Sequence, residues 1–427
     1  MKLWSALALA ALLAAACSDK VSRPESAQPI ALDRSCLVAV AANAGSDENI
    51  AKLQQDLRAR RNARAAEHLG YRFVARARRS NDPGDYVVAE RAADCLESIT
   101  PGEPAALLLR GHVLHQLHRF SEAEAIARRL VTMREFVLDF GLLGDALMEQ
   151  GRVAEAAEAY QKMIDLKPFY QSYTRASHLR WLKGDIDGAV QMMQAAVQAA
   201  SSRDRESVAW AYSRLGSYEL QRGRLAEAAR AADASLQFVP DYAAALLVRG
   251  RIQLAQRKTA DAVLTLERAA RLNPVPEYQW TLADALRLLN RTEDASAIEQ
   301  QLMRDGASGD PRTLALYLST RREHVDKAID LARREMGERQ DVFTLDAMAW
   351  ALASTGNVKE ASTLITRALA EGTDDGRLFL HAAVIAAADG RAADAARYAQ
   401  KAHALRFTLL PSELGVLRSG IGAQPRA

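Results

Sequence analysis

The sequence predicts an all-α solenoid of about nine to ten helical hairpins, because one short pattern recurs along most of its 427 residues. Alanines return at intervals of 33 or 34 residues, with a single interval of 39. Small residues stand twelve positions before them, and glycines often stand five positions before them. A fixed period of this size is typical of stacked helical repeats. The ten alanines, called the ladder alanines below, are Ala89, Ala123, Ala156, Ala189, Ala228, Ala262, Ala295, Ala328, Ala361 and Ala395.

The small residues predict close helix crossings, since two helices that approach closely leave no room for a branched side chain at the contact. Twelve positions before the ladder alanine, a first helix would be touched by its partner. Only Leu316 departs from the rule there. The small residues at this position are Gly111, Gly144, Ser177, Gly216, Gly250, Ala283, Ala349 and Ala383.

The turn between the two helices of each repeat is predicted five positions before the ladder alanine. Glycine and asparagine tolerate the left-handed conformation that ends helices. Residues of this kind are Gly84, Gly151, Gly184, Gly223, Asn290, Gly356 and Gly390. Twelve positions after the ladder alanine, prolines predict the end of the second helix, because proline cannot continue one. They are Pro101, Pro168, Pro240 and Pro274.

This arrangement resembles the tetratricopeptide repeat family, for example over Leu143 to Pro168 and Leu215 to Pro240. The resemblance covers roughly residues 60 to 405 and implies right-handed superhelical stacking, with the first helix of each pair lining a concave groove. It indicates little about function, because the family is a scaffold with many uses. The lysine and asparagine residues with which some members bind a terminal carboxylate are not reproduced.

The first residues predict export. Lys2 precedes an apolar run and then Ala14, Ala15, Ala16 and Cys17, the form of a signal peptide over residues 1–16. Cys17 resembles the lipidation site of bacterial lipoproteins, and Ser18 after it favours the outer membrane by analogy with their sorting. The alternatives are an inner-membrane location and a secreted protein whose cysteine is incidental.

The rest of the chain divides into three predicted parts. Residues 17–45 hold the lipidated cysteine and a flexible tether, with an apolar run from Cys36 to Ala42 that could dock on the first repeat. Residues 46–405 form the solenoid, and residues 406–427 a cap and tail, because solenoids shield their last hydrophobic face. We expect breaks or hinges at Ser201 to Arg205 and at Asp305 to Pro311.

Charge argues against a nucleic-acid partner, since the formal net charge is only +3. Eight arginines nevertheless lie between Arg58 and Arg79, against the single acid Glu67. This patch could meet anionic head groups near the tether, or it could be a solvated helix face.

Cysteines give a second indication of compartment. With Cys17 lipidated, Cys36 and Cys95 remain as a pair in an oxidising environment. They could form a disulfide that closes the first repeat, or they could be two unpaired thiols packed as small hydrophobic groups.

No catalytic motif is recognisable, and we expect neither a metal nor a cofactor. His112, His115 and His118 fan across one helix, so only adjacent pairs could share a metal ion. His118 falls at the turn position, where histidine tolerates a left-handed conformation. His112 and His115 would face the groove and leave a metal-binding or enzyme-accessory protein as an alternative.

The groove is the predicted binding surface, because aromatic residues and arginine dominate binding hot spots. It would grip a peptide or helix of a protein partner, although several tryptophans could instead fill core between repeats. The predicted groove residues are His178, Trp181, Arg214, Arg251, Trp280, Arg287, Tyr317, Arg321, Trp350 and Arg377, with Phe343 beside them.

The sequence therefore predicts a non-catalytic, lipid-anchored scaffold in the periplasm that helps to assemble or regulate an envelope complex. Pilus, secretion, polysaccharide-export and outer-membrane assembly machinery are all compatible with it. A structural spacer without a specific groove ligand is a further alternative.

Overall fold

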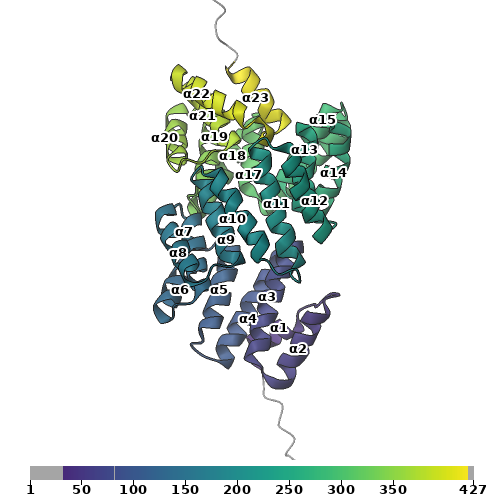
Figure 1. Cartoon of the computed structure of the whole chain (residues 1–427), viewed down its shortest axis with the longest axis vertical. Helices are drawn as coiled ribbons and strands as arrows, with labels where there is room; N and C mark the ends of the chain where they lie inside the picture. Colours follow the sequence, from purple (N-terminus) through teal and green to yellow (C-terminus); the bar gives the residue numbers. More distant parts are fainter. Residues whose placement is uncertain (1–31, 81, 422–427) are drawn as a thin grey trace, which may run out of the picture.

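The computed structural model describes residues 32–80 and 82–421, which form helices and no strand (Figure 1). The predicted signal peptide, Cys17 and the last residues of the tail lie outside this part. The described helices are α1 (Arg34–Ala41), α2 (Glu48–Arg60), α3 (Ala63–Ser80), α4 (Pro83–Ile99), α5 (Pro104–Gln116), α6 (Phe120–Met133), α7 (Val137–Glu149), α8 (Val153–Leu166), α9 (Tyr170–Leu182), α10 (Ile186–Ala199), α11 (Arg205–Gln221), α12 (Leu225–Phe238), α13 (Ala243–Ala255), α14 (Thr259–Leu272), α15 (Pro276–Leu288), α16 (Thr292–Gly309), α17 (Pro311–Arg321), α18 (Val325–Glu338), α19 (Val342–Ser354), α20 (Val358–Leu369), α21 (Gly376–Ala388), α22 (Ala392–Ala404), the 3₁₀ helix η1 (Arg406–Thr408) and α23 (Pro411–Ile421).

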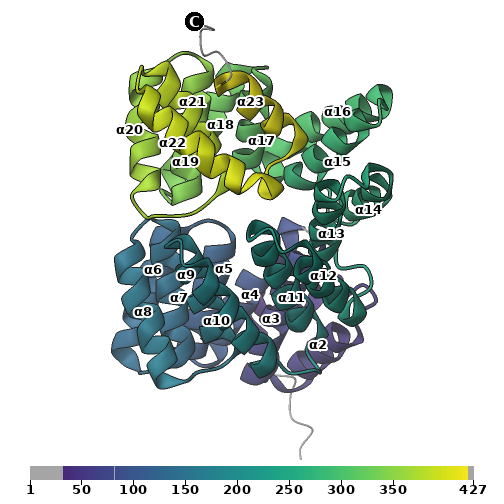
Figure 2. The same ribbon diagram turned by 45° about the horizontal axis from the view of Figure 1, so that its top comes forward.

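The helices from α3 to α22 pair in chain order as ten hairpins, and each hairpin packs against the next. Figure 2 shows them stacked side by side along the chain. This confirms the predicted all-α solenoid of helical hairpins.

The ladder alanines are buried within the stacked hairpins. Nine of the ten are fully buried, and Ala395 is 5% exposed. The small residues twelve positions earlier leave equally little space. A methyl group added at Gly144 would come within 2.3 Å of the Tyr160 ring, and one at Gly250 within 2.5 Å of Leu266. The periodic pattern is therefore a steric requirement of the helix crossings.

The predicted turn residues adopt the left-handed conformation with one exception. Positive φ angles occur at Gly151, Gly184, Gly223, Gly356 and Gly390, and also at Asn290 and His118. The prediction is wrong at Gly84, because α4 already begins at Pro83. There the Asp82 side chain accepts a hydrogen bond from the Gly84 amide at 2.8 Å and caps the helix.

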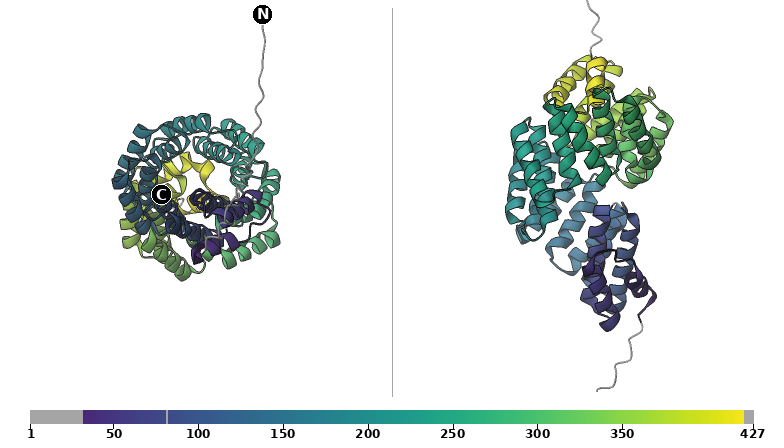
Figure 3. Two further views of the ribbon diagram at one scale, coloured as in Figure 1. Left: turned by 90° about the horizontal axis from the view of Figure 1, so that it is seen from below. Right: turned by 90° about the vertical axis from the view of Figure 1, so that its right-hand side faces the viewer.

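The solenoid closes on itself. Seen along the long axis the hairpins are arranged in a ring (Figure 3). Residues far apart in sequence meet where the second superhelical turn packs on the first. The Lys183 ammonium lies 2.5 Å from Glu371, and the Thr373 hydroxyl donates to the Leu182 carbonyl at 2.5 Å. The Trp181 and Phe343 rings stack with centroids 5.5 Å apart. We call this the turn-to-turn contact.

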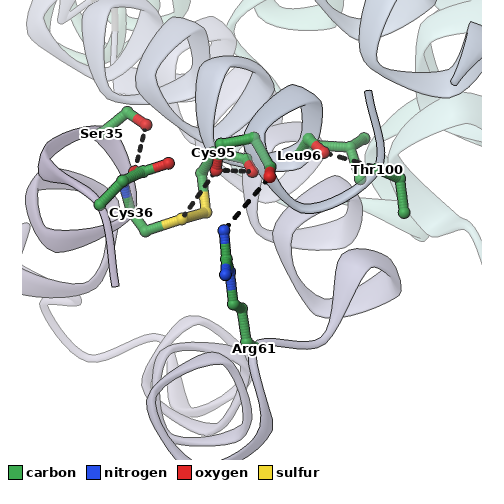
Figure 4. The surroundings of a disulfide bond; sticks show 8 residues. Ser35, Cys36, Arg61, Cys95, Leu96 and Thr100 are labelled. Carbon is green, nitrogen blue, oxygen red and sulfur yellow. Dashed lines mark hydrogen bonds between the residues drawn. A yellow bond between two sulfur atoms is a disulfide. The ribbon is translucent and has the colours of Figure 1, made fainter. Parts of the chain in front are cut away.

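The amino-terminal end is tied to the first repeat. Helix α1, within the predicted tether, packs on α4, and a disulfide joins Cys36 to Cys95 (Figure 4). The Arg61 guanidinium donates to the Ser98 carbonyl beside it, at 3.2 Å. In the loop-entropy description, closing a loop of this length stabilises the fold by about 4 kcal/mol.

The two expected breaks differ from each other. Residues 200–204 form a loop between α10 and α11, yet the two helices pack together, so the stack continues. The polar stretch from Asp305 to Pro311 is mostly helical, because α16 runs to Gly309. Gly306 is buried there, close to Pro276 and Leu314. The helix ends only where Pro311 begins α17.

Replacing Ala156 by leucine should overfill a helix crossing, because Ala156 is fully buried. We expect the substitution to lower the free energy of unfolding by about 1 to 3 kcal/mol, measured by denaturant unfolding. Leucine at the exposed Glu158, on the same helix, is the control and should change little. Equal effects at the two positions would contradict the steric role of the ladder.

Candidate functional site

A large open cavity is lined by residues between α2 and α15, mostly from the first helices of the amino-terminal hairpins. It has a volume of about 1830 Å³. Its walls come from the inner faces of α2, α3, α5, α7, α9 and α11, and from the loops that precede α11, α13 and α15. We call it the N-terminal cavity.

Aromatic side chains form much of the cavity wall. They include Tyr71, Tyr170, Trp210, Tyr242 and Tyr278. Burial raises the pKa of the Tyr170 hydroxyl to about 12, and this hydroxyl donates to the Ser207 carbonyl at 2.9 Å. These rings stay neutral at physiological pH and offer apolar area with polar edges, the character of residues that bind other molecules.

His112 also lines the cavity, whereas His115 and His118 do not line it. Its ring lies beside Tyr71, with centroids 6.3 Å apart, whereas His115 and His118 contact Phe120. Burial, with His115 and Arg78 nearby, lowers the pKa of His112 to about 3, so the ring is neutral. Among the described residues, no group of three or more His, Cys, Asp or Glu side chains could hold a metal ion.

The buried charges at the base of the cavity are paired. The Arg175 guanidinium donates to both carboxylate oxygens of Asp145, at 2.8 and 2.5 Å, and Tyr160 donates to the same carboxylate at 2.8 Å. The Arg175 charge, with these hydrogen bonds, lowers the pKa of Asp145 against the opposing effect of burial. This pair holds α7 against α9 and leaves neither charge unsatisfied.

The predicted groove residues lie elsewhere. None of the ten lines the N-terminal cavity. Trp280, Tyr317 and Trp350 are at most 4% exposed. The Trp350 indole donates to Thr320 at 3.0 Å, and the Trp181 indole donates to Gln221 at 2.8 Å. The aromatic side chains of this set thus contact their own chain, as core residues do.

The predicted groove arginines and His178 are likewise engaged within the chain. Arg287 and Arg321 both meet Glu299, while Arg251 and Arg377 both meet Glu277. Arg214 lies over the rings of Trp181 and Tyr218, and His178 lies beside Trp181. Each of these guanidinium groups therefore already has a contact within the chain.

The chain's own carboxyl-terminal segment, residues 405–421, accounts for much of this burial. Helix α23 covers α21 and α22, as expected of a cap, but it also reaches α15 and α17. There the Ser412 amide and hydroxyl donate to Asp284 at 2.8 and 2.6 Å, and the Trp280 indole donates to Ser412 at 3.0 Å. Glu413 is fully buried and pairs with Arg377. The carboxyl-terminal half of the groove is therefore filled from within.

Most of the cavity residues were not predicted from the sequence, although some of them stand at a fixed distance before the ladder alanines. The residues eleven positions before Ala89, Ala123 and Ala156 are Arg78, His112 and Asp145, and all three line the cavity. In the later repeats the same register points to aromatic residues and arginines that the chain itself engages. Residues from loops, such as Tyr242, have no signal in this register.

Comparisons with known proteins agree with the repeat pattern. The tetratricopeptide repeat family matches residues 141–170 and 247–311, which supports this repeat as the unit there. No curated protein matches the chain. Among the described residues, no helix has the length and apolar character to cross a membrane.

Three solved structures are similar to parts of the chain. A thermophilic repeat protein of Thermus thermophilus, TTC0263, is 19% identical, with 48% of this chain and 100% of that chain covered and a TM-score of 0.38. A human IFIT1 dimer with PPP-AAAA is 13% identical, with 76% of each chain covered and a TM-score of 0.47. Yeast Tom70 is 11% identical, with 84% of this chain and 95% of that chain covered and a TM-score of 0.33.

Replacing Asp284 by asparagine should remove a pH dependence of stability. Burial raises the pKa of Asp284 to about 6, above its unfolded value, so the folded protein loses stability as the pH rises from about 4 past 6. We take the free energy of unfolding of D284N minus that of the wild type. We expect this difference to be about 1 to 3 kcal/mol larger at pH 8 than at pH 5, because only the wild type loses stability over this range. Urea unfolding at both pH values measures this, and an identical difference at the two would contradict the assignment.

Proposed function

We propose that this protein is a non-catalytic scaffold that holds a segment of a partner protein in the N-terminal cavity. The main observation that supports this proposal is the size and lining of the cavity. Its volume of about 1830 Å³ exceeds the range of about 300 to 1000 Å³ that is usual for small-molecule sites. Its walls are built largely from the first helices of consecutive hairpins, so a ligand would contact several repeats at once, as in helix-in-groove recognition.

The titratable groups of the cavity support a binding role over a catalytic one. A histidine with a pKa of about 3, such as His112, is a poor base near neutral pH. Asp145 is engaged by Arg175 and Tyr160. Neither residue has the poised protonation state that general acid–base chemistry needs.

We further propose that the protein works in the bacterial cell envelope, anchored to the outer membrane through lipidated Cys17 and facing the periplasm. The amino-terminal sequence motivates this proposal, and the disulfide between Cys36 and Cys95 supports an oxidising compartment. The complex it serves would be an envelope assembly, such as pilus, secretion, polysaccharide-export or outer-membrane machinery.

Site-specific photocross-linking tests the binding proposal. A benzophenone amino acid placed at Tyr242, in the cavity wall, should cross-link a small set of proteins in cells that produce the full chain. The same group at Glu158, exposed on α8 and outside the cavity, is the control. Cross-linking of the same set at both positions, or none at Tyr242, would contradict a partner in the cavity.

The same cells can report on the anchor. With Cys17 intact, the protein should sediment with the outer membrane, and Cys17→Ala should release it into the soluble envelope fraction, since acyl chains hold a lipoprotein at the bilayer. An unchanged distribution of the variant would refute the lipid anchor and leave the cavity proposal standing.

A further inference from the structure

One wall of the N-terminal cavity carries three cations that pair with no carboxylate in the described part of the chain. Lys52 of α2 and Arg72 and Arg78 of α3 line the cavity, and all three side chains are exposed. Within the described part of the chain, none of the three makes a hydrogen bond or an ion pair. We call these residues the cationic wall. Asp56 of α2 also lines the cavity, so α2 and α3 together contribute three cations and one carboxylate to it.

Other arginines of the same stretch have structural roles. Arg76 pairs with Asp85 at 2.5 Å and donates to the Asn43 carbonyl at 2.8 Å. Arg58 donates to a carbonyl of α1, and Arg61 to the Ser98 carbonyl next to the disulfide. Within this arginine-rich stretch, Arg58, Arg61 and Arg76 therefore hold the first helices together, whereas Arg72 and Arg78 face the cavity.

The remaining charges of the cavity largely balance. Asp145 is paired with Arg175, and Asp241 is paired with Arg268. Around the start of α11, the cavity lining contains two arginines, Arg203 and Arg205, and two acids, Asp204 and Glu206. Asp204 accepts hydrogen bonds from Ser207 and caps the helix. The unbalanced positive charge of the cavity therefore comes from α2 and α3.

The cavity strengthens the effect of this charge. A hollow with low-dielectric walls focuses the field of the side chains that line it. This influence reaches the neighbouring repeat, because Arg78 contributes to the lowered pKa of His112 on α5, after burial and His115. On other sides of the cavity stand Tyr170, Trp210 and Tyr242, which we call the aromatic wall.

We infer that the N-terminal cavity takes an acidic, amphipathic segment of a partner protein, with its carboxylates on the cationic wall and its apolar side chains on the aromatic wall. This inference rests on the proposed function and adds the chemistry of the partner. Arginine favours carboxylates because it can bind them with two parallel hydrogen bonds. The cavity volume would hold roughly a dozen residues of helix, given the helix diameter and rise.

Peptide display tests the inference while the partner itself is unidentified. A random 14-residue peptide library is selected on the full chain, and binders are kept only if a photoreactive group at Tyr242 cross-links them. We expect the selected peptides to be enriched in Asp and Glu relative to the starting library. We also expect K52E/R72E/R78E to weaken their binding at least 10-fold in fluorescence anisotropy.

The control replaces three exposed arginines outside the cavity, R60E/R64E/R304E, and should leave binding within about 2-fold. Selected peptides without an acidic bias, or with equal affinity for both variants, would overturn this inference and leave the proposed function intact. Failure to select any cavity-directed peptide would overturn both. Tighter, wall-dependent binding of a 12-nucleotide oligoadenylate would also overturn it, in favour of a nucleic-acid ligand.

Discussion

The close crossing of helices at small side chains is the constraint on which the rest of this structure depends. The ladder alanines, one in the second helix of each hairpin, are buried, nine of the ten completely. A glycine such as Gly144 allows a ring from the second helix to approach to a distance that no added methyl group would permit. Because the same contact recurs in every repeat, the same rotation recurs as well, and the stack must curve.

The curvature decides which part of the inner surface is available. After about 190 residues the chain meets itself, and Lys183 pairs with Glu371 across the turn-to-turn contact. The carboxyl-terminal segment then fills the inner face of the later repeats, through Ser412 on Asp284 and Glu413 on Arg377. The amino-terminal half keeps an open cavity. The protein therefore packs its own carboxyl-terminal segment against the inner face of the later repeats and leaves the inner face of the earlier repeats open.

Much of the fold could be predicted from the sequence, because the steric rules act within one repeat. The ladder, the left-handed turn at His118 and the helix ends before the prolines all follow from local chemistry. Gly84 shows the limit, since a capping aspartate and a proline start α4 there. The open site could not be located, because the burial of Trp280 by Ser412 joins residues 132 positions apart. The spacing of Cys36 and Cys95 in the sequence could not decide whether they are free thiols or a disulfide, and in the structure they form a disulfide.

Zero-length cross-linking of the purified monomer tests the central claim most directly. Carbodiimide joins an amine to a carboxylate only at contact distance, and the Lys183 ammonium lies 2.5 Å from Glu371, 188 residues further along the chain. A closed superhelix predicts a Lys183–Glu371 cross-linked peptide pair in the mass spectrum, absent from the Lys183→Arg variant. Cross-links confined to single hairpins and their immediate neighbours would show that the second turn does not rest on the first, and would contradict this account.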